Sequence, residues 1–419
     1  MRILWLSHLI PYPPKGGVLQ RSYYLLRELA KYHEVDLLAF NQKNLIEPLF
    51  ASLEEGVSAA DRELKSFCRR VEFFPIASDE RALGSYLLAA RSLLSKDPYN
   101  INWLKSITFE KRVREYVSKH DYALVHFDTI SLIPFIRAIG NLPTVLDHHN
   151  IESHMLLRRA ENESSRFKSW YYYQEGKRLE SYEQRLCPGF DLNITCSEMD
   201  KERLLRIAPD CHAEVVPNGV DVNYFRSTAS EVDGKRLVFM GTLSWYPNRE
   251  AVLFIANELW PKLKESIPDI RFDIIGANPP KQLLDLACTD DHFVVHGFVD
   301  DPRPLISAAA VFICPIRDGG GTKLKILDAF AMGKAVVANP VACEGINVDN
   351  GNNVIFANDV SEYTAQIKRL VEDSAYRKQI GLAARSLVER EYSYSSIGKK
   401  LSQLFEEIVI TSDSPDLTH

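Results

Sequence analysis

Short apolar segments alternate with longer helical patterns along most of this chain. The first series runs from "ILWLS" at 3–7 through a helical pattern at 18–32 to "VDLLAF" at 35–40, and further apolar segments begin at 71, 122, 144 and 192. Segments that are apolar throughout are typical of strands covered on both faces, and helices between them favour parallel connections. The sequence therefore predicts an α/β fold built on a doubly wound parallel sheet.

A second series of the same kind follows a polar interruption. The stretch 207–235 is rich in Pro, Gly, Asn and Asp, which predicts a linker, and apolar segments then begin at 236, 270, 293, 310, 334 and 353. A chain of 419 residues is long enough for two cores. We expect two Rossmann-like domains, over 1–210 and 211–390, and a C-terminal helix and polar tail over 391–419 that return to the N-terminal domain.

The segment "RDGGGTKLKILDAFAMGKAVVA", 317–338, joins an apolar strand to a helical pattern through three glycines. Ligands of parallel α/β sheets bind at the carboxyl ends of the strands, so we expect this loop to line a cleft between the domains. Glycines allow close backbone approach, and the free amides of a first helical turn attract anions. We expect a phosphate to be bound here by Gly319, Gly320, Gly321, Thr322 and Lys323. The P-loop pattern is absent.

Asp328 follows Lys323 by five residues on the expected helix, a rise of about 7 to 8 Å. A carboxylate there can accept hydrogen bonds from a ribose diol, which would make the anion a nucleotide. The alternative is that Asp328 only favours the N-terminal half of its helix. Lys325 lies two residues after Lys323, so we expect it on another side of the helix.

Charge and composition exclude several classes of protein. A net charge of -6 and a pI near 6.0 argue against a nucleic-acid partner. Seven scattered cysteines with no C-x-x-C pair fit a cytoplasmic protein without a zinc site. Neither D-x-D nor H-E-x-x-H occurs, so we expect no essential metal. No apolar run approaches the ~20 residues of a membrane span, so any contact with the inner membrane would be peripheral.

Four segments together resemble family 4 glycosyltransferases of the GT-B fold. "GGGTKLKILDAFAMGKAVV" is similar to the donor-binding signature of that family, which usually has Glu where Asp328 stands. "PYPPKGG" at 11–17, "VVPNGVDVNYF" at 215–225 and "FMGTLSWYPNREAVLFI" at 239–255 resemble its glycine loop, its interdomain segment and its first C-domain βα unit. "DHHNIES" at 147–153 resembles a motif of bacterial sugar transferases that assemble exopolysaccharides.

The resemblance implies a retaining, metal-independent hexosyltransferase that moves a sugar from a nucleoside diphosphate-sugar to a glycan or lipid-linked glycan. The donor is a substrate, so no cofactor is expected, and the departing phosphate is the implied base for the acceptor. The catalytic residues implied are Lys323, Asp128 and His149. Gly16, Gly17 and Arg249 are placed at the donor phosphates, and His126, Asp128, His149 and Asn150 at the sugar or acceptor.

Two departures from the family pattern and several alternatives accompany this prediction. Arg249 alone stands where the family has an Arg and Lys pair, and the first carboxylate of its E-x7-E motif falls on Gly320. The glycines at 16–17 can merely permit a turn, and His148 or His149 can be a buried core residue. The helix expected over 152–186, with aromatics at 170–173, either rests on a membrane or packs inward.

Other functions share parts of this pattern. A non-hydrolysing sugar-nucleotide epimerase has the same two-domain fold, and a non-catalytic protein that binds nucleotide sugars would have the same donor site. An NAD-dependent oxidoreductase is disfavoured, because no strand is followed by G-x-G-x-x-G.

Overall fold

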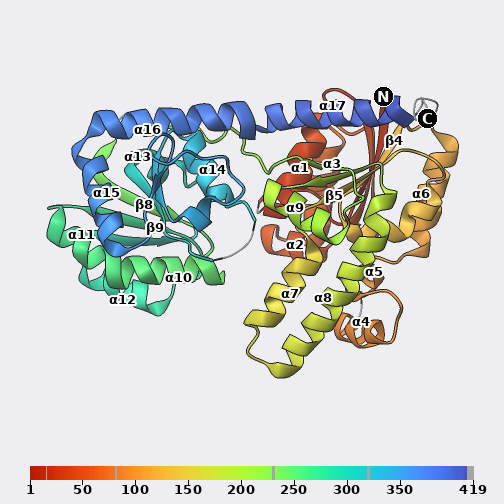
Figure 1. The fold of residues 1–419 in the computed structure, drawn as a ribbon, viewed down its shortest axis with the longest axis horizontal. Coiled ribbons are helices and arrows are strands. Elements are labelled where there is room, and N and C mark those ends of the chain that lie inside the picture. Colours follow the sequence, from red (N-terminus) through yellow and green to blue (C-terminus); the bar gives the residue numbers. More distant parts are fainter. Residues whose placement is uncertain (16, 81–82, 229–231, 319–320, 413–419) are drawn as a thin grey trace. The chain divides into compact units, whose positions relative to one another are not determined.

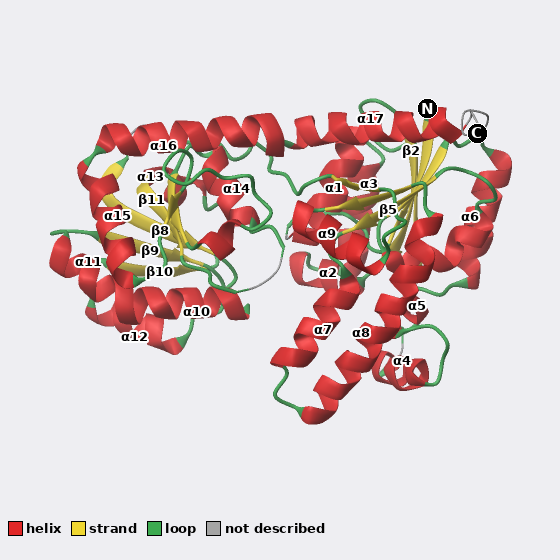
Figure 2. Cartoon of the chain, viewed as in Figure 1, coloured by secondary structure: helices red, strands yellow, loops and turns green. Residues whose placement is uncertain are grey.

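The computed structural model describes residues 1–15, 17–80, 83–228, 232–318 and 321–412. The chain forms two compact units (Figure 1). Unit 1 comprises Met1–Pro217 and the residues from Ile397 onward, and unit 2 comprises Asn218–Ser396. Each unit is an α/β domain with helices on both faces of one sheet (Figure 2).

Unit 1 contains a sheet of seven parallel strands in the order β3-β2-β1-β4-β5-β6-β7. In chain order they are β1 (Arg2–Ser7), β2 (Glu34–Asn41), β3 (Arg70–Pro75), β4 (Leu124–Phe127), β5 (Thr144–His148), β6 (Leu192–Thr195) and β7 (Ala213–Val215). The helices are α1 (Gly17–Leu29), α2 (Lys43–Ile46), α3 (Leu53–Leu64), α4 (Gly84–Leu93), α5 (Tyr99–Trp103), α6 (Ile107–Lys119), α7 (Glu152–Asn162), α8 (Arg166–Leu186) and α9 (Glu198–Ile207).

The two faces of the unit 1 sheet each bury an apolar cluster. Successive side chains of a strand point to opposite faces, so Ile3 and Trp5 of β1 join one cluster and Leu4 and Leu6 join the other. The first cluster packs against α1, α3 and α17 (Tyr394–Ser412), and the second against α6, α8 and α9. Helix α17 contributes the buried side chain of Phe405 to the core of unit 1.

Unit 2 contains a sheet of six parallel strands in the order β10-β9-β8-β11-β12-β13. They are β8 (Asp233–Met240), β9 (Arg271–Ile275), β10 (Phe293–Gly297), β11 (Ala309–Cys314), β12 (Ala335–Ala338) and β13 (Ile355–Phe356). The helices are α10 (Tyr246–Phe254), α11 (Trp260–Ser266), α12 (Lys281–Thr289), α13 (Arg303–Ala308), α14 (Leu324–Ala331), α15 (Val360–Glu372) and α16 (Ser374–Leu387).

The predicted fold class is confirmed, and the structure changes two details of the sequence prediction. The expected linker over 207–235 contains β7, which pairs with β6, so unit 1 extends to Pro217 rather than to residue 210. The single helix expected over 152–186 is a pair, α7 and α8, because the chain leaves the helical conformation at Glu163 and restarts after Ser165. At Gly176 an added Cβ would lie 2.9 Å from Leu157 Cδ2, so the two helices pack closely there.

Candidate active site

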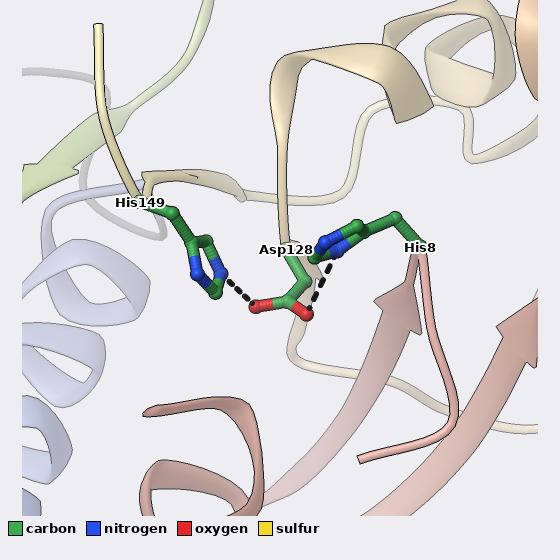
Figure 3. Close-up of side chains that lie close together, drawn as sticks. All are labelled: His8, Asp128 and His149. Carbon is green, nitrogen blue, oxygen red and sulfur yellow. Dashed lines mark hydrogen bonds and ion pairs between the residues drawn. The ribbon is translucent and has the colours of Figure 1, made fainter. Parts of the chain in front are cut away.

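Three polar side chains meet where three neighbouring strands of unit 1 end. His8 follows β1, Asp128 follows β4 and His149 follows β5, and these strands are adjacent in the sheet. Because the strands are parallel, their carboxyl ends lie at one edge, and both imidazoles approach the Asp128 carboxylate there (Figure 3).

The Asp128 carboxylate is completely buried and accepts several hydrogen bonds. Its Oδ1 accepts from His149 Nε2 at 2.9 Å. Its Oδ2 accepts from the hydroxyls of Ser7 and Ser22, each at 2.9 Å, and lies 3.3 Å from His8 Nδ1. A buried carboxylate with this many donors is held in one orientation.

Asp128 and His149 favour each other's charged forms. Although burial opposes ionisation, the His149 and His8 imidazoles hold the pKa of Asp128 well below its usual range. Burial also acts against a charged His149, yet the Asp128 carboxylate raises the pKa of His149 above 6.5. The pair therefore favours an imidazolium with a carboxylate, which leaves His149 Nδ1 available as a second donor toward a ligand.

The structure corrects the expectation for His126. Its side chain has no exposed surface, stacks on Trp5 with ring centres 3.6 Å apart, and lies 5.8 Å from the ring of Phe405. Burial lowers the pKa of His126 to about 4, so this ring is neutral at physiological pH. His126 is therefore a core residue, because β4 directs its side chain into the sheet face that α17 covers.

His148 is also a buried core residue, which is one of the two alternatives that the sequence left open. It is buried and shares a hydrogen bond of 3.1 Å with Asn193 Oδ1, and burial lowers its pKa. Asn150, by contrast, is half-buried directly after His149. Of the four residues expected at the sugar or acceptor, the structure brings Asp128 and His149 together, with Asn150 beside them in sequence.

Sequence reasoning missed His8 and a buried ion pair between Arg21 and Asp147. Arg21 donates to both Asp147 oxygens, at 2.8 and 3.1 Å, and to the carbonyls of Val216 and Pro217 at the end of unit 1. His8 was detectable, because the histidine of "LSH" follows β1 as Asp128 follows β4. The Arg21 pair had no such signal, since its members lie 126 residues apart.

In unit 2, the loop after β11 leads to the N-terminus of α14. Gly321 has φ 72°, a conformation that favours glycine. Lys323 is the N-cap residue with extended backbone, so α14 begins at Leu324 and both Thr322 and Lys323 precede the helix. The Lys323 side chain is buried and its Nζ donates to Gly321 O at 2.9 Å. Gly319 and Gly320, like Gly16 in unit 1, lie outside the described residues.

Asp328 lies on the buried side of α14 and is only 8% exposed. Among the residues that the structure describes, its carboxyl makes neither a hydrogen bond nor an ion pair. Burial raises its pKa to about 8, although Lys325 opposes this shift. A buried, unpartnered carboxyl is unfavourable in a purely structural role, which points to a ligand that satisfies it.

Lys325 does not lie on a separate, solvated side of the helix. Because Lys323 precedes the helix, the placement expected from helical spacing does not apply, and Lys325 Nζ donates to Asn248 Oδ1 in α10. Arg249, its neighbour in sequence, is exposed. Sequence reasoning singled out Arg249 and missed Asn248, because the sequence does not show which of two consecutive residues in the first turn of α10 faces the neighbouring helix.

Comparison with known proteins decides the family. Residues 15–224 match Glycosyltransferase Family 4, and residues 234–373 match Glycosyl transferases group 1. The chain belongs to glycosyltransferase family 4.

This glycosyltransferase is similar to proteins along its full length. It is 23% identical to an uncharacterized 44.6 kDa protein in the cps region of Klebsiella pneumoniae, over 97% of this chain and 99% of that one. Its fold matches sucrose-phosphate synthase from Thermosynechococcus elongatus with a TM-score of 0.67 at 16% identity, covering 98% and 100% of the two chains. It also matches Anabaena HepE, solved with UDP, with a TM-score of 0.65 at 17% identity, covering 97% and 100%. The fold is therefore GT-B.

Two further observations bear on metal and membrane. The ligand atoms of His8, Asp128 and His149 lie within 4.8 Å of one another, as do those of His126, Asp128 and Asp147. The Asp128 oxygens already accept hydrogen bonds from Ser7, Ser22 and His149. The absence of an essential metal stays a prediction.

No helix in the described ranges has both the length and the apolar character to cross a bilayer.

Proposed function

We propose that this family 4 glycosyltransferase moves a hexose, with retention of configuration, from a nucleoside diphosphate-sugar to a glycan or lipid-linked glycan in bacterial polysaccharide assembly. The relative in a cps region supports the polysaccharide context. The complex of the similar Anabaena HepE with UDP-glucose supports the class of donor.

The unpartnered carboxyl of Asp328 is the observation that carries this proposal. Gly321, Thr322 and Lys323 lie at the mouth of α14, and Asp328 lies further along the same helix. A phosphate at the N-terminus of α14 and a ribose at the Asp328 carboxyl would match a nucleotide that lies parallel to the helix. The Thr322 hydroxyl oxygen is buried and has no hydrogen-bond partner among the described residues, so this hydroxyl can donate to the phosphate.

The transfer step needs charge stabilisation more than a protein base. The bond from the anomeric carbon to the donor phosphate breaks, and the acceptor oxygen forms its bond on the same face of the sugar. The acceptor proton passes to the departing phosphate oxygen. The Lys323 ammonium and the α14 amides stabilise the nucleoside diphosphate as it leaves. His149, whose pKa the Asp128 carboxylate raises, donates to a sugar or acceptor hydroxyl.

We propose that no metal takes part in this step, because lysine and helix amides supply the positive charge. Turnover in EDTA should equal turnover in its absence, with the released nucleotide as the measured product. Loss of turnover that Mg²⁺ or Zn²⁺ restores would show that the step requires an ion, for which the His8, Asp128 and His149 group is a candidate site.

We also propose that the enzyme works at the cytoplasmic face of the inner membrane, where a lipid-linked acceptor would lie. On the α7 and α8 pair, Phe167, Trp170 and Tyr173 are 72%, 48% and 49% exposed. Exposed aromatic rings beside basic residues such as Arg166 and Lys168 suit the headgroup region of a bilayer. Sedimentation with anionic vesicles should fall when Phe167 and Trp170 are both changed to Ser.

The experiment that tests the function is a thermal-shift panel of UDP, GDP, ADP and their sugars, followed by a transfer assay with the sugar nucleotide that binds. A nucleotide that binds only the folded state raises the melting temperature as its concentration exceeds Kd. Stabilisation with sugar transfer supports the proposal. Conversion of the donor without release of nucleotide would favour an epimerase, and binding without any turnover a binding protein.

A further inference from the structure

Lys325 reaches from the first turn of α14 to the first turn of α10. Its Nζ donates to Asn248 Oδ1, and Asn248 Nδ2 donates to Thr242 O at 2.8 Å, which fixes the orientation of the amide. The two helices follow β11 and β8, which are neighbours in the sheet. One ammonium therefore lies at the carboxyl ends of both strands.

The backbone at Gly241 is shaped around this ammonium. A Cβ added at Gly241 would lie 2.4 Å from Lys325 Nζ and 2.7 Å from Asn248 Nδ2. The turn at Gly276 also packs closely against Gly241, since a Cβ added at Gly276 would lie 1.9 Å from Gly241 O. Any residue but glycine at 241 would take the place that the ammonium occupies.

The ammonium forms no ion pair with a carboxylate in the described part of the chain. Lys325 makes no ion pair there, its one hydrogen bond goes to the neutral Asn248, and its Nζ lies 4.9 Å from the centre of the Phe239 ring. The titratable groups facing it are Cys314 on β11 and, on its own segment, Lys323 and Asp328, and burial lowers its pKa to about 8. Lys325 is half-buried, and its ammonium keeps donors that an anion can use.

We propose that Lys325, held by Asn248 against Gly241, binds the distal phosphate of the donor. This inference rests on the proposed function and deepens it, because it assigns the second phosphate-binding cation that the family pattern places after the first C-domain strand. In this chain only the exposed Arg249 stands there in sequence. The cation comes instead from α14, and it reaches the same strand end through Asn248.

The first test is Lys325→Met, which keeps the side chain's bulk and removes its charge. Calorimetric titration with the diphosphate that wild type binds, UDP or GDP, should give a Kd raised about 10- to 100-fold, the range for a lost charge-assisted hydrogen bond. The matching monophosphate should lose less than about 3-fold, since it lacks the distal phosphate. Without nucleotide, Lys325→Met should melt at or above the wild-type temperature, because it removes a half-buried charge that makes no ion pair among the described residues.

A matched control and two further variants keep the test decisive. Lys368→Met on α15, where Lys368 is exposed and 3.8 Å from Glu372, should bind as wild type. Asn248→Asp should weaken diphosphate binding more than Asn248→Ala, because a carboxylate there pairs with Lys325 and repels the phosphate. Gly241→Ala should behave like Lys325→Met, since its Cβ displaces the ammonium.

The outcomes separate this inference from the function on which it rests. If wild type binds no nucleoside diphosphate, the proposed function is overturned. If wild type binds one, and Lys325→Met and Asn248→Asp both bind it equally well, this inference alone is overturned. A lower melting temperature in Lys325→Met with unchanged diphosphate affinity would make Lys325 a structural residue and would also overturn it.

Discussion

Asp328 is the residue whose environment is least explicable without a ligand, being 8% exposed with a pKa that burial raises to about 8. Asp328→Asn should raise the Kd for nucleosides and nucleotides alike about 10-fold, because the amide replaces one of the two acceptor oxygens that a ribose diol can use with a donor. Asp328→Glu should bind nearly as wild type. Titration with a nucleoside and its diphosphate checks this, and an unchanged Kd for both in Asp328→Asn would refute the ribose assignment.

Asp128 sets the protonation of His149 in unit 1. Its carboxylate raises the pKa of His149 against the effect of burial, so that Asp128→Asn should lower it. Histidine ring resonances followed by NMR over pH 5 to 9 report the change, and sugar transfer above pH 6.5 should fall with it. His126 is the internal control, because its ring is buried on the face covered by α17. An unaltered His149 titration would exclude Asp128 as the positioning residue.

At the scale of elements, the α7 and α8 pair depends on one buried carboxyl. Glu183 of α8 accepts from Ser153 N at 3.2 Å and from the Ser153 hydroxyl, at the start of α7. Burial raises its pKa from 4.5 to about 7. A carboxyl with a raised pKa in the folded state contributes stability that is full below pH 4.5 and is lost as pH rises through about 7.

In the wild-type protein the free energy of unfolding should therefore fall by about 2 to 3 kcal/mol between pH 4.5 and 8 because of Glu183. Glu183→Gln should abolish this fall. Denaturant titrations at several pH values, with hydrogen exchange of α7 amides, measure it. Glu180→Gln is the matched control on α8, since Glu180 is partly exposed and pairs with Lys177 at 2.7 Å. Equal pH slopes in wild type and Glu183→Gln would contradict the prediction.

At the scale of the whole molecule, the end of the chain completes the core of its beginning. Phe405 of α17 has no exposed surface and packs in the cluster of Trp5, and Ser402 shares a hydrogen bond of 2.8 Å with His33. Phe405→Ala should cost unit 1 about 3 to 5 kcal/mol of unfolding free energy. Ile410→Ala on the same helix, where Ile410 is 67% exposed, should cost little.

Calorimetry distinguishes the units in this experiment. The transition of unit 1 should shift to lower temperature in Phe405→Ala, while that of unit 2, which spans Asn218–Ser396, should stay. A shift of both transitions by the same amount would mean that the units unfold as one.

The sequence by itself determined the class of fold and the strand ends that carry the chemistry. Apolar runs and helical periodicity are local properties, so β1, β8 and the mouth of α14 were readable from them. The short strand β7 was not, because three residues inside a polar stretch give no periodic signal, and only pairing with β6 defines it.

Tertiary structure decided which of the candidate side chains face one another. Asp128 and His126 are two residues apart, yet β4 ends at Phe127, so Asp128 lies beyond the strand, where it meets His149, while His126 stays within the strand and faces the core. Helical spacing did not predict the contact between Lys325 and Asn248, because α14 begins after Lys323 and Asn248 comes from another helix, α10. Side-chain direction and burial are set by contacts between distant segments, which no local pattern contains.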